Sequence, residues 1–302
     1  MLRWRLLSAA VLISALIGLM WLDAHEVLWG RPGFWLLPVA VLFLGLGTLE
    51  LLDLFRAQGF DPRRDTALIG VTLVTIAAAA PNFWTDYPAT CPVGRNGWPL
   101  IAFGLSVALV LVGEMRRFYE PGRANMHAAL GVFAVAYVGL LGSFLVLIRQ
   151  VRGNATGLAA LVSLILVVKM SDAGAYFAGR MFGRHKMSPI LSPKKTLEGG
   201  IGGVLASIAS SGLFFVVIAP RWLGEQAPEV ATWRWVVYGG VLAIAGMIGD
   251  LAESMLKRDS AIKDASKRLP GLGGVLDVLD SLLVGAPIAY AFWITGLIPN
   301  AK

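Results

Sequence analysis

The sequence predicts an all-α, polytopic integral membrane protein with about nine transmembrane helices. Of its 302 residues, 57% are hydrophobic and only 15% are charged, whereas ordinary soluble domains carry roughly 25% charged residues. Apolar runs recur along the whole chain, and each is near the ~20 residues that a helix needs to cross the hydrocarbon core of a bilayer. The runs cover residues 4–22, 34–55, 67–84, 98–115, 127–148, 157–182, 200–220, 235–256 and 273–297.

The first run follows a basic start, MLRWR, which is also typical of a signal peptide. The segment after the run, WLDAHE, has no small-x-small cleavage site. We therefore interpret residues 4–22 as the first transmembrane helix.

The positions of the basic residues indicate an orientation. Eighteen of the 26 Lys and Arg residues flank one alternating set of span ends and seven flank the other, while Lys169 lies inside a span. Because cytoplasmic flanks carry the excess of Lys and Arg, we expect the amino terminus in the cytoplasm and the carboxyl terminus outside. This topology accounts for the net charge of +7, so no nucleic-acid partner is expected.

Cysteine and histidine chemistry is not expected. Cys91 is the single cysteine, so no internal disulfide can form, and His25, His127 and His185 are far apart in the sequence. No Ser/His/Asp spacing stands out. A metal site built on His or Cys is therefore not predicted.

The chain is interpreted as one membrane domain with two different halves, because no polar linker or internal repeat interrupts it. Residues 1–150 have mostly apolar spans, with Glu50, Asp53 and Glu114 near cytoplasmic ends. The spans of residues 151–302 carry more charge, namely Lys169, Asp172, Glu198, Asp250, Glu253, Asp277 and Asp280. An ionised Asp at mid-bilayer costs roughly 2.5–3.5 kcal/mol, so these acids are expected to line a hydrated, charge-compensated cavity near the cytoplasmic face.

One helix face at the end of the eighth run gathers polar side chains. Asp250 and Glu253 are three residues apart. Ser254 lies four residues after Asp250, and Lys257 lies four residues after Glu253. This spacing places all four on one stripe of a helix. An exposed helix end with a Glu253–Lys257 pair is the alternative interpretation.

Asp277 and Asp280 share a second helix face, at the start of the ninth run. Because a short loop joins the eighth and ninth runs, antiparallel packing would bring both carboxylate stripes to a similar depth. Oxygen ligands without His or Cys favour Mg²⁺ or a similar hard cation. The sequence therefore predicts a Mg²⁺ site here, with a second cation as a further option.

Basic residues near these acids could hold the phosphate oxygens that a metal ion leaves uncovered. They lie in the loop between the two runs and are Lys257, Arg258, Lys263, Lys267 and Arg268. The LPGLGG turn of the same loop supplies Gly271, Gly273 and Gly274, and glycines let the backbone come close to a ligand.

A second anion site is predicted in LSPKKTLEGGIGG. Ser192 followed by Pro193 is a helix-start pattern, and Lys194 and Lys195 would stand beside the exposed amides of that helix end. A basic loop that merely follows the topology is the alternative.

Upstream, Lys169 and Asp172 share a helix face, either as a mutually neutralising pair or as catalytic groups. Gly174 and Ala178 of the same segment would permit close helix packing.

These residues resemble the CDP-diacylglycerol synthases, also called phosphatidate cytidylyltransferases, over roughly residues 165–285. The family pattern reads S-x-x-K-R-x4-K-D, then L-P-G-H-G-G, then D-R-x-D. The matching residues are Ser254, Lys257, Arg258, Lys263, Asp264, Pro270, Gly271, Gly273, Gly274, Asp277 and Asp280. Two positions depart: Leu272 stands where the family has His, and Val278 where it has Arg. Neither side chain can donate a hydrogen bond.

The resemblance implies cytidylyl transfer from CTP to phosphatidic acid, giving CDP-diacylglycerol and pyrophosphate at the cytoplasmic face of a bacterial inner membrane. Residues 151–302 would form the catalytic region and residues 1–150 the amino-terminal helices. It assigns Asp250, Asp277 and Asp280 both to the metal and to catalysis, and Lys257, Arg258, Lys263 and Asp264 to catalysis. Together with the spacing of the residues it adds Glu253 to the metal ligands and predicts a substrate-binding set of Ser254, Lys194, Lys195, Asp172, Gly271, Gly273 and Gly274. A homodimer is compatible with this interpretation.

Two other functions stay open. A transporter for an anionic solute also needs polar groups among its helices, although transporters commonly place such sites at the midplane between related halves, whereas the charges here crowd toward one face. A catalytically weak, lipid-binding paralogue is favoured only by Leu272 and Val278.

Overall fold

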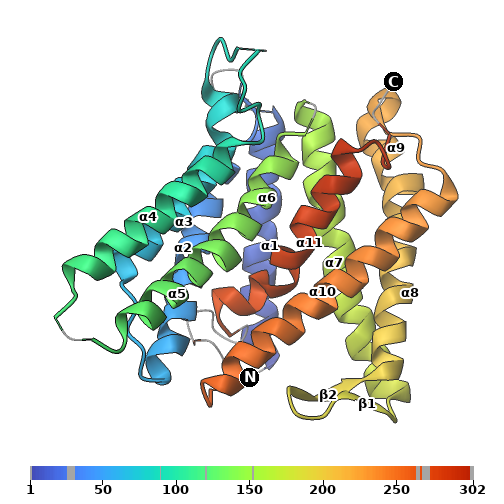
Figure 1. Cartoon of the computed structure of the whole chain (residues 1–302). Coiled ribbons are helices and arrows are strands. Elements are labelled where there is room, and N and C mark those ends of the chain that lie inside the picture. The colour runs from blue at the N-terminus through green and yellow to red at the C-terminus, as the bar shows by residue number, and fades with distance from the viewer. Residues whose placement is uncertain are drawn as a thin grey trace. The chain divides into compact units, whose positions relative to one another are not determined.

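The computed structural model describes residues 2–25, 31–88, 90–119, 121–151, 153–262, 266 and 273–299. In this part of the chain the regular structure is helical apart from one short β-hairpin (Figure 1). The elements are α1 (Leu2–His25), α2 (Leu36–Ala57), α3 (Arg64–Phe83), α4 (Trp98–Arg116), α5 (Ala124–Ala134), η2 (Val135–Leu140), α6 (Leu141–Arg149), α7 (Asn154–Phe182), β1 (Lys186–Ser188), β2 (Ser192–Thr196), α8 (Leu197–Leu213), η3 (Phe214–Ile218), α9 (Ala219–Leu223), η4 (Gly224–Gln226), α10 (Thr232–Asp259) and α11 (Val275–Ile294).

Eight helical segments among the described residues are long and apolar enough to cross a membrane. Six are the single helices α2, α3, α4, α7, α10 and α11. The other two, Ala124–Arg149 and Leu197–Leu223, each continue through a π-helical turn, η2 or η3. A shorter apolar segment, Ala10–His25, lies in α1. These segments correspond to the nine predicted runs, so the prediction of an all-α, polytopic integral membrane protein is confirmed.

The chain divides into two compact units. The first unit contains Met1–Leu147 and Leu256–Leu279, and the second contains Ile148–Met255 and Asp280–Lys302. The boundaries fall inside α6, α10 and α11, so these helices contribute residues to both units. The division of the sequence into residues 1–150 and 151–302 stays a prediction.

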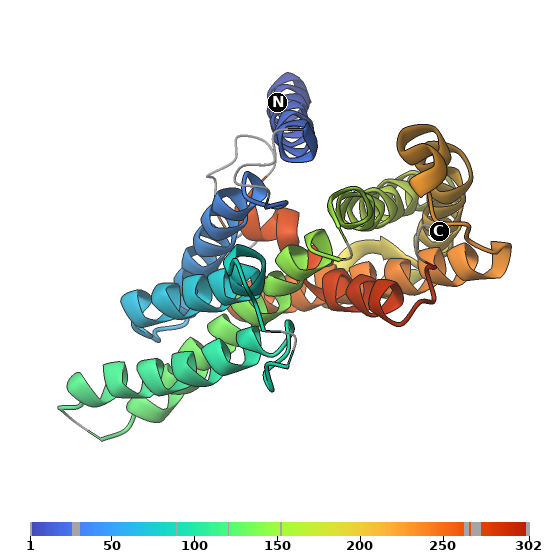
Figure 2. The same ribbon diagram turned by 90° about the horizontal axis from the view of Figure 1, so that it is seen from above.

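In the first unit, α3 packs against α2, α4 and η2, and α4 lies beside α5 in both views (Figures 1 and 2). The packing is close at Gly70 of α3. A Cβ atom there would lie 2.9 Å from Val135 Cγ2 and 3.1 Å from Ser106 Cβ. Small residues let helices approach closely where the lipid supplies no hydrophobic driving force, so Gly70 allows α3 to approach both η2 and α4.

In the second unit, α7 and α8 run side by side (Figure 1). A Cβ atom at Gly174 would collide with Ala206 Cβ, and one at Gly202 would collide with Ala178 Cβ. The prediction that Gly174 and Ala178 permit close helix packing is therefore confirmed.

The predicted helix start at Ser192–Pro193 is wrong. Ser192 begins strand β2, which pairs antiparallel with β1 so that Lys186 lies opposite Thr196. The helix α8 begins only at Leu197, because the Thr196 side chain caps it: its Oγ1 accepts a hydrogen bond from Gly199 N at 3.1 Å. A Thr oxygen at this position satisfies an amide that has no partner within the helix, and pairing with β1 keeps the preceding residues extended.

Candidate active site

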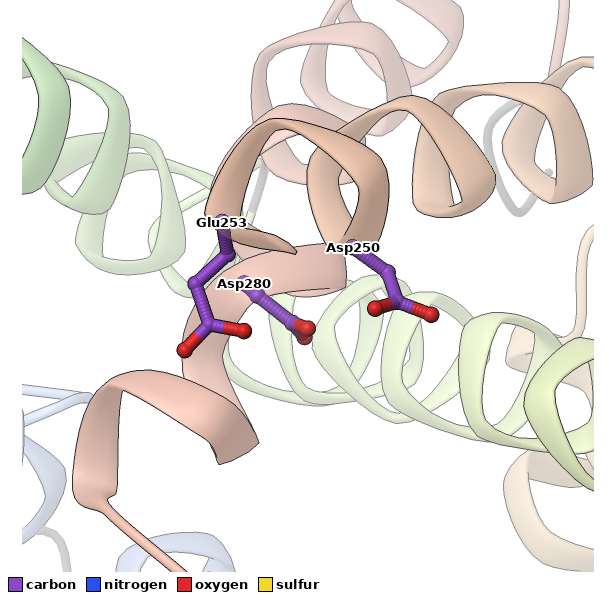
Figure 3. A group of neighbouring side chains, drawn as sticks. All are labelled: Asp250, Glu253 and Asp280. Atoms are coloured by element: carbon purple, nitrogen blue, oxygen red, sulfur yellow. The ribbon is translucent and has the colours of Figure 1, made fainter. Parts of the chain in front are cut away.

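Three carboxylates from two helices meet in the second unit. Asp250 and Glu253 come from α10 and Asp280 from α11, and one oxygen of each lies within 4.8 Å of the others (Figure 3). Glu253 and Asp280 are buried, whereas Asp250 is half-buried. Like charges at this separation repel unless protons or cations intervene. The group could therefore hold a metal ion through oxygen ligands alone.

Glycines on α10 explain how the two helices come so close. A Cβ atom at Gly249 would collide with the Asp280 carbonyl, and one at Gly246 would lie 3.6 Å from Ser281 Cβ. Because Asp250 and Glu253 are three residues apart, they project from one helix face. The expected juxtaposition of the α10 stripe with the next helix is thus present for Asp280.

Lysine side chains accompany the carboxylates of the second unit. Lys195 Nζ, from β2, lies 2.5 Å from Asp250 Oδ2. Lys169 Nζ, from α7, lies 3.4 Å from Asp172 Oδ2 and donates to Ser281 Oγ at 2.9 Å. The interpretation of Lys169 and Asp172 as an ion pair is confirmed. Three segments, β2, α7 and α11, therefore bring positive and negative groups into the neighbourhood of the α10 acids.

Asp277 belongs to the first unit. Its Oδ1 atom lies 2.6 Å from Lys257 Nζ, and its Oδ2 atom accepts a hydrogen bond from Gly274 N at 2.6 Å. Gly273 has a φ of 94°, in the left-handed region that favours glycine, and a Cβ atom there would lie 2.6 Å from Asp277 Oδ2. Gly273 and Gly274 therefore lie close against the Asp277 carboxylate.

Three other predicted site residues are described by the structure but are not part of the carboxylate group Asp250, Glu253 and Asp280. Ser254 and Arg258 lie in the last turns of α10, where Arg258 is exposed, and Lys194 is exposed on β2. The remaining predicted residues lie outside the described part of the chain: Lys263, Asp264, Lys267, Arg268, Gly271 and Leu272. A single metal site formed by Asp250, Asp277 and Asp280 together stays a prediction.

Comparison with known proteins identifies the family. The sequence model of the cytidylyltransferase family matches residues 3–295, nearly the whole chain. The chain belongs to the cytidylyltransferase family. This membership confirms the resemblance that the spaced Ser, Lys, Arg, Gly and Asp residues of the two last runs indicated.

Relatives of this cytidylyltransferase carry a more specific name. The phosphatidate cytidylyltransferase of Staphylococcus saprophyticus is 34% identical over 258 residues, which are 85% of this chain and 89% of the relative. That of Staphylococcus aureus is 35% identical over 191 residues, 63% of this chain and 66% of the relative. That of Chlamydia muridarum is 42% identical over 130 residues, 43% of this chain and 41% of the relative.

One side chain of this cytidylyltransferase was not among the predicted site residues. Glu50 of α2 is fully buried, and it accepts hydrogen bonds from Leu276 N at 2.8 Å and from Ser266 Oγ at 2.5 Å. The sequence signal that could have indicated a role for Glu50 was its position as an acidic residue inside an apolar run. Its partner lies 226 residues further along the chain, so the sequence pattern around Glu50 could not indicate the contact.

Proposed function

We propose that this protein is a phosphatidate cytidylyltransferase. In this reaction a phosphate oxygen of phosphatidic acid attacks the α-phosphorus of CTP. A new P–O bond forms, the bond to the β-phosphate breaks, and CDP-diacylglycerol and pyrophosphate result. The observation that carries the proposal is the carboxylate group Asp250, Glu253 and Asp280, with Lys195 beside it, on membrane helices of a chain that belongs to the cytidylyltransferase family.

Asp250, Glu253 and Asp280 are the proposed Mg²⁺ ligands. Their donors are all oxygen atoms, which Mg²⁺ prefers over nitrogen and sulfur, and their mutual repulsion favours a bound cation. When bound, Mg²⁺ neutralises triphosphate charge and stabilises the pyrophosphate leaving group. Asp277 stays a proposed ligand on the strength of the family pattern alone, as does a second cation.

Basic side chains would orient the phosphates. Lys195 and Lys257 are each ordered by a carboxylate, Asp250 and Asp277 respectively. A lysine that is already held in place loses less conformational entropy when it binds a phosphate than a free surface lysine does. Lys194 and Arg258, which are exposed, and Lys263, which lies outside the described residues, complete the proposed phosphate-binding set.

The attacking group needs no general base, because the phosphate of phosphatidic acid is already anionic. The residues therefore bind, orient and compensate charge, which is the main contribution of a protein to phosphoryl and nucleotidyl transfer. The expected contribution of Asp172 to substrate binding is in keeping with this, since Asp172 lies within reach of Lys169 and Ser281.

For the orientation we propose a cytoplasmic amino terminus, an active site at the cytoplasmic face and a carboxyl terminus outside, in a bacterial inner membrane. The excess of basic residues at one set of span ends supports this orientation. The relatives named above are bacterial proteins. A homodimer stays a prediction.

The competing interpretations differ in whether CTP is consumed and pyrophosphate is released. A transporter has no reason to release pyrophosphate, and the family match gives it no support. A lipid-binding paralogue would bind phosphatidic acid without consuming CTP.

The test is pyrophosphate release by the purified protein in mixed micelles. Release should require CTP, phosphatidic acid and Mg²⁺ together, and Asp280→Asn should strongly lower it at the Mg²⁺ concentration that saturates the wild type. Asp53→Asn is the matched control, because Asp53 pairs with Arg64 and is not one of the proposed metal ligands. Pyrophosphate release that does not depend on phosphatidic acid, or no release at all from folded protein, would contradict the proposed function.

A further inference from the structure

Glu50 connects α2 to the beginning of α11. Its Oε2 atom accepts a hydrogen bond from Leu276 N and its Oε1 atom accepts one from Ser266 Oγ, at 2.8 and 2.5 Å. The carboxylate is fully buried. An ionisable group buried in a helix that crosses a membrane is costly, and these two hydrogen bonds give it a specific local role.

The first turn of α11 needs such an acceptor. The first amides of a helix have no partner within the helix, and a Ser, Thr, Asp or Asn side chain usually satisfies one of them from the residue before the first turn. In α11 that residue is Gly274, which has no side chain. Asp277 accepts from Gly274 N, and Glu50 accepts from Leu276 N, so a distant side chain supplies the missing cap.

Glycines make room for this arrangement. A Cβ atom at Gly274 would lie 2.5 Å from Glu50 Oε2. One turn before Glu50, a Cβ atom at Gly47 would lie 3.4 Å from Leu279 Cδ1 and 3.8 Å from Leu276 Cδ1. The backbone of α2 at Gly47 therefore packs against leucine side chains of α11, and the absence of a side chain at Gly274 leaves room for the Glu50 carboxylate.

A second contact holds the other end of the same loop. Gln58 Nε2, at the end of α2, donates to Ser260 Oγ at 2.9 Å. Ser260 follows α10, and Leu276 lies in the first turn of α11. Side chains of α2 therefore hold the chain on both sides of the basic, glycine-rich loop.

We propose that Glu50 is a positioning residue for the nucleotide, acting through the first turn of α11. By holding Leu276 N and Ser266, it fixes the turn in which Asp277 orders Lys257 at 2.6 Å. Loss of Glu50 leaves Lys257 less well oriented toward the phosphates of CTP. This inference rests on the proposed function, since it assigns Lys257 to CTP.

The contact itself can be tested without any enzyme activity. Hydrogen exchange of the peptide that begins α11 should be roughly ten- to a hundredfold faster in Glu50→Ala than in the wild type, since a hydrogen bond to a charged acceptor is lost. Asp53→Ala, which removes a carboxylate from the same helix, should leave that peptide unchanged. Equal exchange in Glu50→Ala and the wild type would overturn the inference.

Kinetics then distinguish positioning from general destabilisation. Glu50→Ala should raise the KM for CTP by about tenfold or more and change the KM for phosphatidic acid by less than about twofold. Partial unfolding would lower the amount of active enzyme and leave both KM values unchanged. An unchanged KM for CTP would therefore sink the proposal.

Glu50→Gln separates hydrogen bonding from charge. The Gln amide can accept from Leu276 N and donate to Ser266 Oγ, so the KM for CTP should stay within about threefold of the wild type. Damage equal to that of Glu50→Ala would show that the charge itself is needed, and would overturn a purely positioning role.

If Glu50→Ala does not fold, Gly274→Ala gives the same test, because the new methyl group would displace the Glu50 carboxylate. It should raise the KM for CTP in the same direction, and an unchanged value would contradict the proposal. A wild-type protein that forms no product from CTP and phosphatidic acid would defeat the proposed function, while the hydrogen-exchange comparison would still decide whether Glu50 holds α11.

Discussion

The ammonium group of Lys195 lies 2.5 Å from the carboxylate of Asp250. The two residues are 55 positions apart in the sequence and come from different elements, the β-hairpin and α10. The sequence pattern indicated two separate places, one for anions around Lys194 and Lys195 and one for a metal around Asp250. The structure joins them, so a phosphate bound by Lys195 would lie beside the proposed metal ligands.

Lys195→Ala should therefore impair CTP turnover. Lys195 is partly buried against Asp250, and removal of a charged hydrogen-bond donor to phosphate costs roughly 1.5–3 kcal/mol, or about ten- to a hundredfold in kcat/KM. Lys186→Ala is the matched control, since Lys186 is an exposed lysine of the same hairpin. Steady-state kinetics with varied CTP would check this, and equal effects of the two substitutions would argue against Lys195 as a phosphate-binding residue.

The metal site predicts how activity responds to Mg²⁺. Asp280→Asn preserves the shape of the side chain and removes one charged oxygen ligand. The Mg²⁺ concentration for half-maximal activity should rise by at least about tenfold, because even residues that only support metal ligands typically contribute that much to affinity. Glu253→Gln should act in the same direction. A magnesium titration that is unchanged in both variants would place the cation elsewhere.

The acids of the second unit could be predicted because each one is costly in an apolar helix. Asp250 and Glu253 are three residues apart, and Asp280 lies in the second turn of the next helix, so local spacing and the packing of consecutive helices were enough to bring them together. The apolar runs predicted the helices for the same reason, since length and hydropathy are properties of each segment alone.

Contacts between distant segments could not be predicted in this way. Ser192–Pro193 has the local pattern of a helix start, but pairing with β1 and the Thr196 cap decide where α8 begins. Glu50 and Leu276 are 226 residues apart, and the sequence around either residue does not indicate a contact with the other. Tertiary packing overrides local preference at both places.

The orientation predicts which cysteines are accessible from outside. Cys91 lies in the segment between α3 and α4, and an impermeant maleimide should label it in intact spheroplasts. The hydroxyl of Tyr87 holds the pKa of the Cys91 thiol below its ordinary value, so more thiolate is present at neutral pH and labelling should be fast. Tyr87→Phe should slow it.

The control for this orientation uses the hairpin. Ile190→Cys, at a position that is 87% exposed, should react only after permeabilisation when Cys91 is replaced by Ser. Two results together would contradict the proposed orientation. They are labelling of the cysteine introduced at position 190 in intact spheroplasts, and no labelling of Cys91 in the wild type.

The two departures from the family pattern predict a slow enzyme. Where the family has His and Arg, this chain has Leu272, outside the described residues, and Val278, which is half-buried in the first turns of α11. Val278 follows Asp277, whose carboxylate orders Lys257, so an arginine there would add a positive charge close to a proposed phosphate-binding lysine. Leu and Val provide no such donor.

The substitutions Leu272→His and Val278→Arg should therefore raise CTP turnover, and together they should raise it more than either does alone. Each charge-assisted hydrogen bond is worth roughly 1.5–3 kcal/mol, which is about ten- to a hundredfold in rate if it acts on the transition state. Compensation by Lys267 or Arg268 predicts the opposite: the wild type would already be fast, the double substitution would be neutral or harmful, and Arg268→Ala would be severely damaging.

We expect a slow but genuine enzyme, because the carboxylates of α10 and α11 and the ordered lysines Lys195 and Lys257 all remain. Single-turnover measurements of CDP-diacylglycerol formation on the wild type, both single variants and the double variant would distinguish these cases. The absence of any product from all four, in folded protein with Mg²⁺ and phosphatidic acid present, would show that the departures belong to a protein that no longer catalyses the reaction.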